Sequence, residues 1–162
     1  MSRLARLVHG RQGERGQALV EFALLLPLML LIITGLFDVA RAVWQENTLA
    51  YAAREGTRYA IVHGSAGSPA AGPDNPGCSG LLPDQVICTE IPRVVREAAL
   101  GVQNVTVVIT YPDIVGSTPC ADRNCRIIVD ATAPFVPLPS QYLLGSAYQI
   151  TLKGGSQLVI QR

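Results

Sequence analysis

The sequence has few charged and few aromatic residues. Of 162 residues, 15% are charged and 6% are aromatic, and the formal net charge is +1. A chain this close to neutral has no overall field to attract a polyanion, so we expect no nucleic-acid partner. At 49% apolar residues the chain is rather apolar for a soluble domain, and its length suits one modest domain plus an anchor.

Catalytic and metal-binding motifs are also missing. The chain contains no G-x-S-x-G, H-E-x-x-H or phosphate-loop sequence. Of the two histidines, His9 lies near the N-terminus and His63 stands alone at a predicted helix end, where we expect a solvated side chain. An extracytoplasmic enzyme is therefore the least favoured hypothesis, and we expect no cofactor and no bound metal.

The few charges are unevenly distributed. The net charge is +3 over residues 1–16 and −2 over the remainder. The basic residues of the first segment are Arg3, Arg6, Arg11 and Arg15. Residues 1–16 therefore form a basic leader in front of a nearly neutral body.

An uninterrupted apolar run follows this leader. Phe22 to Phe37 reads FALLLPLMLLIITGLF, sixteen residues without a charge. As a helix this run is about 24 Å long, slightly short of a bilayer core of about 30 Å. Apolar residues extend it on both sides, and Trp44 suits an interfacial position. We predict a membrane span over about residues 18–40, with the basic N-terminus inside and the C-terminal domain outside.

Two other interpretations of the apolar run remain. A buried helix of a soluble protein conflicts with the length of the run and its basic flank. A cleaved secretory signal would use Ala40-Arg41-Ala42 as its small-x-small site. Cleavage there would cut a helical pattern that continues beyond it.

Glu21 lies where the chain would enter the hydrocarbon. A lone acid at mid-bilayer costs a few kcal/mol on insertion scales, and less near the interface. One interpretation is an interfacial side chain that reaches water. In the other, the chain is cut after Gly16, so that Gln17 carries an α-ammonium that compensates the Glu21 carboxylate on the same or a neighbouring helix.

Two stretches of this region resemble a known family. Arg15 to Pro27 reads RGQALVEFALLLP, and Tyr51 to Ala60 reads YAAREGTRYA. They are similar to the start of the helix and to the Ala-Arg-Glu-Gly-x-Arg segment of TadE-like pseudopilins, which are minor components of the tight-adherence (Tad) branch of type IV pilus machines. The resemblance is strong over residues 15–62 and weaker beyond them.

The resemblance implies how such a chain matures and what it contacts. In the family a prepilin peptidase cleaves after the glycine that corresponds to Gly16, four residues before an acid–aromatic pair matched here by Glu21 and Phe22. The implied function is a non-enzymatic pilus or secretion component in the cytoplasmic membrane. The implied partners are the lipid bilayer, the prepilin peptidase, other pilin or pseudopilin subunits and the inner-membrane assembly platform.

The helical pattern continues past the membrane run and predicts one helix from about Ala18 to Val62. Pro27 can kink this helix. A Gly/Pro-rich loop over residues 63–83, a helix over 89–100 and strands over 105–111 and 126–132 follow. We expect a rigid turn at Pro134, Pro137 and Pro139, and a final hairpin of residues 148–152 and 157–161 around Gly154-Gly155.

This order of elements predicts an α+β, pilin-like fold, with a long N-terminal helix packed on a small antiparallel sheet. The expected division is a leader (1–16), a helix (17–62) that spans the membrane in its first half, and an extracytoplasmic α+β domain (63–162).

All four cysteines follow the apolar run, on the side expected to be oxidising. Of three possible connectivities, the local one pairs Cys78 with Cys88 and Cys120 with Cys125. A four-cysteine zinc site is the alternative, but the spacings are irregular for it.

The later part of the predicted helix carries one candidate partner surface. Arg54 and Arg58 lie one helical turn apart and could form a basic face, although solvated charge is the usual role of such residues. A membrane-anchored binding module that is neither processed nor polymerised remains the competing function.

Overall fold

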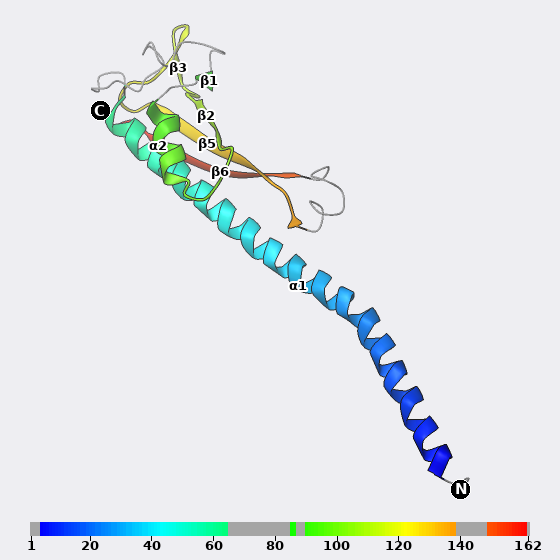
Figure 1. The fold of residues 1–162 in the computed structure, drawn as a ribbon. Helices are drawn as coiled ribbons and strands as arrows, with labels where there is room; N and C mark the ends of the chain where they lie inside the picture. Colours follow the sequence, from blue (N-terminus) through cyan, green and yellow to red (C-terminus); the bar gives the residue numbers. More distant parts are fainter. Residues whose placement is uncertain (1–3, 65–84, 87–89, 139–148, 162) are drawn as a thin grey trace.

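The computed structural model describes residues 4–64, 85–86, 90–138 and 149–161, with backbone alone for residues 4–15 and 85–86. A single long helix, α1 (Leu4–Val62), extends far beyond a small domain made of a sheet and a short second helix, α2 (Glu90–Ala98) (Figure 1). The α+β, pilin-like fold class predicted from the sequence is confirmed.

Helix α1 begins earlier than the sequence pattern predicts. It starts at Leu4 rather than near Ala18, and it ends at Val62 as expected. Residues 4–17 contain no proline and several strong helix formers, so the helix continues into them. Pro27 lies inside the helix, which curves within its blue part in Figure 1.

The four-stranded sheet is antiparallel throughout, in the order β1-β2-β5-β6. The strands are β1 (Gln85–Val86), β2 (Thr106–Thr110), β5 (Arg126–Phe135) and β6 (Ile150–Val159). A separate small hairpin pairs β3 (Ile114–Val115) with β4 (Thr118–Pro119). The helix predicted over 89–100 is observed as α2, and Gly101, at φ 76°, follows its end as a left-handed glycine typically does.

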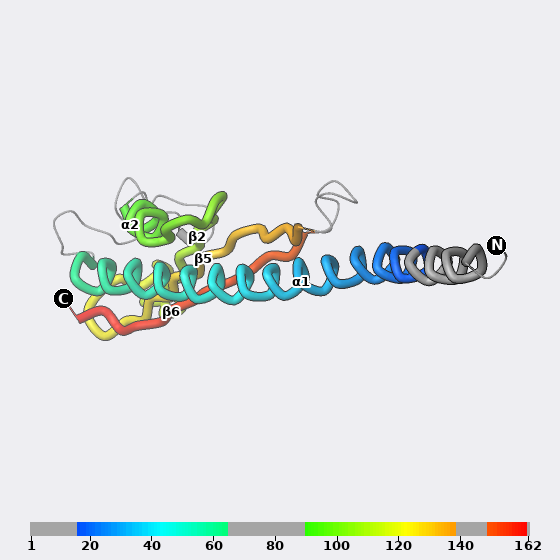
Figure 2. Tube along the Cα trace, turned by 60° about the horizontal axis from the view of Figure 1, so that its bottom comes forward, coloured from blue at the N-terminus to red at the C-terminus, as the bar shows by residue number. Residues whose placement is uncertain are grey.

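Helix α1 packs along β5 and β6, and α2 lies beside it (Figure 2). Alternate residues of β5 are buried, from Ile127 to Phe135, because one face of the sheet is covered by the helices. Gly56 allows the close approach, since a Cβ at this position would overlap Val95 of α2 and lie 3.3 Å from Val129 of β5.

The predicted C-terminal hairpin is wrong. Residues 150–159 form one continuous strand, and Gly154 and Gly155 pair with Ala131 and Asp130 in its middle. Gly154 is buried, and a Cβ there would lie 2.7 Å from the Cα of Ala50. The two glycines therefore mark the place where α1 crosses β6 at backbone contact, and not a turn.

The rigid turn predicted at Pro134 is also corrected. Pro134 belongs to β5 and pairs with Thr151 of β6. The pairing of β5 with β2 ends at Thr132, so Pro134 lies where β5 has a neighbour on one side alone. A proline is tolerated at such an edge because no ladder hydrogen bond is required of it there.

Candidate functional site

The surface of α1 before the domain is almost entirely apolar and exposed. Phe22 and Phe37 are 62% and 63% exposed, and none of the most apolar 18-residue window is buried. The helix is long and apolar enough to cross a membrane. Thr34 donates its hydroxyl to the carbonyls of Leu30 and Leu31, so its polar group is satisfied within the helix. Apolar surroundings are needed to cover a surface of this kind.

The expected processing residues lie together at the start of this surface. Gly16 has open space around it, with nothing within 4 Å of a Cβ built there. Gln17 donates from Nε2 to Oε1 of the exposed Glu21 at 3.2 Å, since residues four apart share a helix face. Gly16, Gln17, Glu21 and Phe22 are therefore accessible, while the leader side chains lie outside the described part of the chain.

A partly buried polar cluster, here called the neck, lies directly after the apolar surface. It consists of Asp38, Arg41 and Gln45 of α1 with the segment Pro134–Leu138. Asp38 is only 6% exposed; one of its carboxylate oxygens accepts the backbone N–H of Leu138 at 2.7 Å, and the other lies 3.1 Å from Arg41 Nη1. The neck thereby ties the end of β5 to the helix where α1 leaves the domain.

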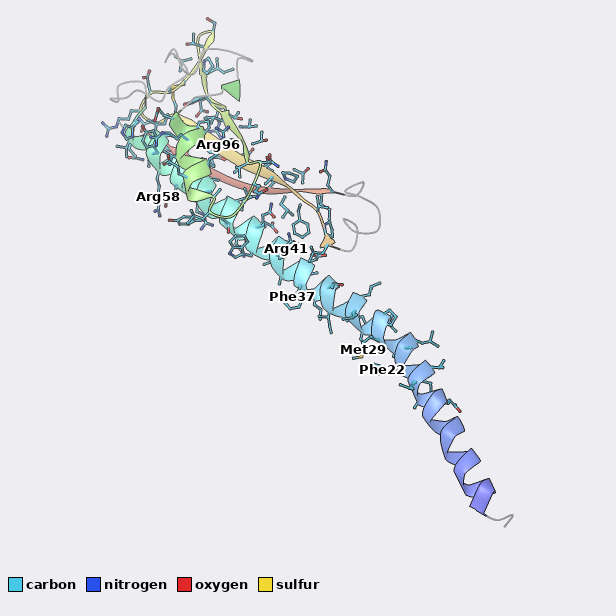
Figure 3. The ribbon with its side chains drawn as sticks, viewed as in Figure 1. Phe22, Met29, Phe37, Arg41, Arg58 and Arg96 are labelled. Carbon is cyan, nitrogen blue, oxygen red and sulfur yellow. A yellow bond between two sulfur atoms is a disulfide. The ribbon has the colours of Figure 1, made fainter. Side chains whose placement is uncertain are left out.

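Two further contacts complete the neck. The Arg41 guanidinium lies 5.3 Å from the ring centroid of Phe135, and Gln45 Nε2 donates to the Pro134 carbonyl at 3.4 Å. Figure 3 shows Arg41 beside the end of β5. The sequence did not predict a site at Asp38 and Arg41. Their three-residue spacing, typical of a helical ion pair, was the signal available.

We expect Asp38→Ala to loosen the neck while leaving the fold intact. The change removes the charged acceptor of the Leu138 N–H, a hydrogen bond worth about 1.5–3 kcal/mol. Amide exchange of Leu138, followed by hydrogen-exchange mass spectrometry, should therefore accelerate about 10- to 100-fold. Glu55→Ala is the control, because Glu55 pairs with Arg58 in an exposed ion pair far along the helix. Unchanged exchange at Leu138 in Asp38→Ala would contradict the role of this carboxylate.

The opposite end of the domain is held by a disulfide. Cys120 and Cys125 are bonded, with their Cα atoms 5.9 Å apart, which leaves neither thiolate for zinc. Asp113 accepts from the Arg126 side chain at 2.7 Å and from its backbone N–H at 2.6 Å, and these hydrogen bonds hold the pKa of Asp113 below its usual value. The predicted Cys78–Cys88 bridge lies outside the described residues.

The remaining candidate residues have local contacts. Arg58 pairs with Glu55 at 3.0 Å and Arg54 is exposed, as expected for solvated charge. His63 is half-buried rather than solvated, because its ring stacks on Tyr59 at 4.1 Å. Within the described residues no three His, Cys, Asp or Glu side chains are grouped to hold a metal ion.

The fold and the exposed helix fit a single-pass membrane protein that carries a small α+β domain. Residues 16–58 match the family model described as TadE-like protein. The match confirms the resemblance seen in the sequence, and it contains the anchor, Glu21 and the helical side of the neck. The match is consistent with a TadE-like membrane protein associated with the Tad pilus. No curated protein and no solved structure gives a significant match to the chain.

Proposed function

We propose that the protein is a minor pseudopilin of a Tad-type pilus or secretion machine, anchored in the cytoplasmic membrane and without enzymatic activity. The observation that carries this proposal is the exposed apolar helix with Gly16 and Glu21 at its start, inside the region that matches the family. The basic leader supports a cytoplasmic N-terminus, with the domain of residues 63–162 outside the membrane.

Processing would follow from the accessibility of Gly16. A prepilin peptidase that cleaves after Gly16 leaves Gln17 as the new N-terminus of a helix of residues 17–62. Its α-ammonium then lies four residues before Glu21, on the same helix face. The existing contact between Gln17 and Glu21, at 3.2 Å, supports this proximity.

Assembly would use the apolar surface of α1. The large apolar side chains between Leu19 and Phe37, about five turns of the helix, are all exposed. Lipid covers this surface in the membrane, and helices of other pilin or pseudopilin subunits, gathered by the inner-membrane assembly platform, cover it in a bundle. Glu21 then neutralises an ammonium of its own or a neighbouring helix.

We expect the protein isolated from its native membrane to lack residues 1–16 by intact mass. Gly16→Leu should abolish this loss in a host with an active prepilin peptidase. The matched control is Gly35→Leu on the same helix, since a Cβ at either glycine has nothing within 4 Å and neither change disturbs the packing. Wild-type protein that retains residues 1–16 in such a host would contradict the pseudopilin proposal and favour an unprocessed, membrane-anchored binding module.

A further inference from the structure

A polar pocket of about 430 Å³ lies at the neck. This volume is in the range of small-molecule sites. Its lining comes from α1, the turn after α2, the end of β5 and the residue that precedes β6. The polar side chains that line it are Arg41, Gln45, Gln103, Asn104 and Gln149.

The pocket has the chemistry of a site for a phosphate ester. Arg41 is the one charged side chain among the described residues that line it. A guanidinium has five N–H donors, and Arg41, whose side chain is 50% exposed, gives one nitrogen to Asp38. The ring of Phe135 lies against the guanidinium. The amides of the pocket add donors and acceptors, so an anion with polar substituents fits better than a bare ion.

The level of the pocket on the helix indicates where such an anion would come from. Arg41 and Gln45 follow Phe37 by four and eight residues, roughly 6 and 12 Å along the axis. The headgroup layer of a bilayer leaflet is about 5–8 Å thick. When α1 is anchored through its apolar run, the pocket therefore lies beside the lipid phosphates of the leaflet on the domain side.

An exposed apolar patch lies beside the pocket. Trp44, Tyr51 and Leu100 are 55%, 54% and 75% exposed, and all three line a second hollow of about 410 Å³. The turn at Gly101 lines the polar pocket and rests on Trp44, whose ring would lie 2.9 Å from a Cβ at that position. Trp44 follows Phe37 by seven residues, about 10 Å along the axis, so the patch lies outside the acyl layer, and Trp44 suits the membrane interface.

We propose that the neck binds a phospholipid of the surrounding membrane, with its phosphate at Arg41 and its acyl chains along the exposed apolar side chains of α1 that precede the neck, such as Leu36 and Phe37. The bound lipid holds the domain at a fixed height and angle on the membrane surface. This inference rests on the membrane placement of α1 in the proposed function, and not on processing or assembly.

The test uses the full-length, uncleaved chain, purified in dodecyl maltoside from a host without prepilin peptidase. Dihexanoyl phosphatidylglycerol is titrated, and the lipid-bound fraction is measured by native mass spectrometry. We expect saturable binding of one lipid, weakened about tenfold or more in Arg41→Gln, which loses a charged hydrogen-bond donor. Gln103→Glu should also weaken binding severalfold, because it adds a like charge to the pocket and leaves the Asp38–Arg41 pair in place.

Arg58→Gln is the matched control, since it removes the same charge from the same helix at a side chain that is 69% exposed. Its affinity should equal that of the wild type. Unchanged Leu138 exchange in Gln103→Glu shows that the neck is still folded. Equal affinities of wild type, Arg41→Gln and Gln103→Glu would overturn the proposal.

Two further probes distinguish binding of a phospholipid from binding of a free anion and from apolar contact alone. Competition by inorganic phosphate at the same concentration would show an anion site and overturn the assignment to lipid. Equal binding of dihexanoylglycerol, which has no phosphate, would show apolar contact alone and overturn it as well. If the protein is cleaved after Gly16 in its native host but does not bind lipid in these tests, this inference is wrong and the proposed function stands.

Discussion

Replacing Gly154 by alanine is expected to destabilise the domain by about 3 kcal/mol, the upper end of what overpacking usually costs. The new Cβ would overlap the Leu49 carbonyl carbon and the Ala50 backbone nitrogen, and it would lie 2.7 Å from the Ala50 Cα. No side-chain rotation relieves a clash between two backbones, so α1 must move away from β6. The thermal midpoint, followed by near-ultraviolet circular dichroism of the full chain in detergent, should fall by roughly 10 °C or more.

The neighbouring glycine provides the control. A Cβ at Gly155 would meet the Asp130 carboxylate oxygen at 2.5 Å, which is the end of a side chain that can rotate. The accompanying loss is at most the ion pair between Asp130 and Lys153 at 2.9 Å, and exposed pairs of this kind contribute about 0–1 kcal/mol. Gly155→Ala should therefore lower the midpoint by only a few degrees. Equal midpoints for the two variants would show that α1 does not rest on Gly154.

The elements that follow from local pattern could be predicted from the sequence. The apolar run and the helical pattern that follows it predicted α1 to its end at Val62, because a helix of constant period leaves a continuous signal. The β-branched runs predicted β2 and the first part of β5, since alternating burial selects such residues. The same local spacing favoured the pairing of Cys120 with Cys125, which the structure contains.

Features that depend on distant partners could not be predicted in this way. Gly154-Gly155 has the composition of a turn, and only the crossing of α1 explains why a glycine is needed inside a strand. The Asp38 carboxylate accepts from Leu138, a residue 100 positions away. An acidic residue next to an apolar run looks the same in the sequence whether it binds a distant backbone N–H or simply ends the membrane span. A glycine inside a helix, such as Gly56, likewise gives no local signal that α2 and β5 pack against it.

Glu21→Ala is expected to leave processing and membrane insertion intact and to weaken assembly severely. In the proposed bundle the Glu21 carboxylate neutralises the ammonium of a processed Gln17. Removing one partner of a buried charge pair costs about 3–5 kcal/mol, because the other charge stays buried and unpaired. Co-purification with other pilus subunits should therefore fall roughly 100-fold or more at limiting concentration. Insertion should be unchanged or slightly improved, since an acid has left the apolar segment.

Comparison with Glu21→Gln distinguishes the effect of the Glu21 charge on assembly from the effect of its side-chain shape. Glutamine preserves the size of the side chain and its ability to accept a hydrogen bond, but it cannot neutralise an ammonium, so its effect should approach that of alanine. Glu46→Ala is the control, because it removes an exposed acid from the same helix beyond the neck and should assemble as the wild type does. The variants are compared in the native host by mature mass, membrane fraction and co-purification. If Glu21→Gln assembles normally, Glu21 acts through its shape or reaches water at the interface, and the charge pair with Gln17 is excluded.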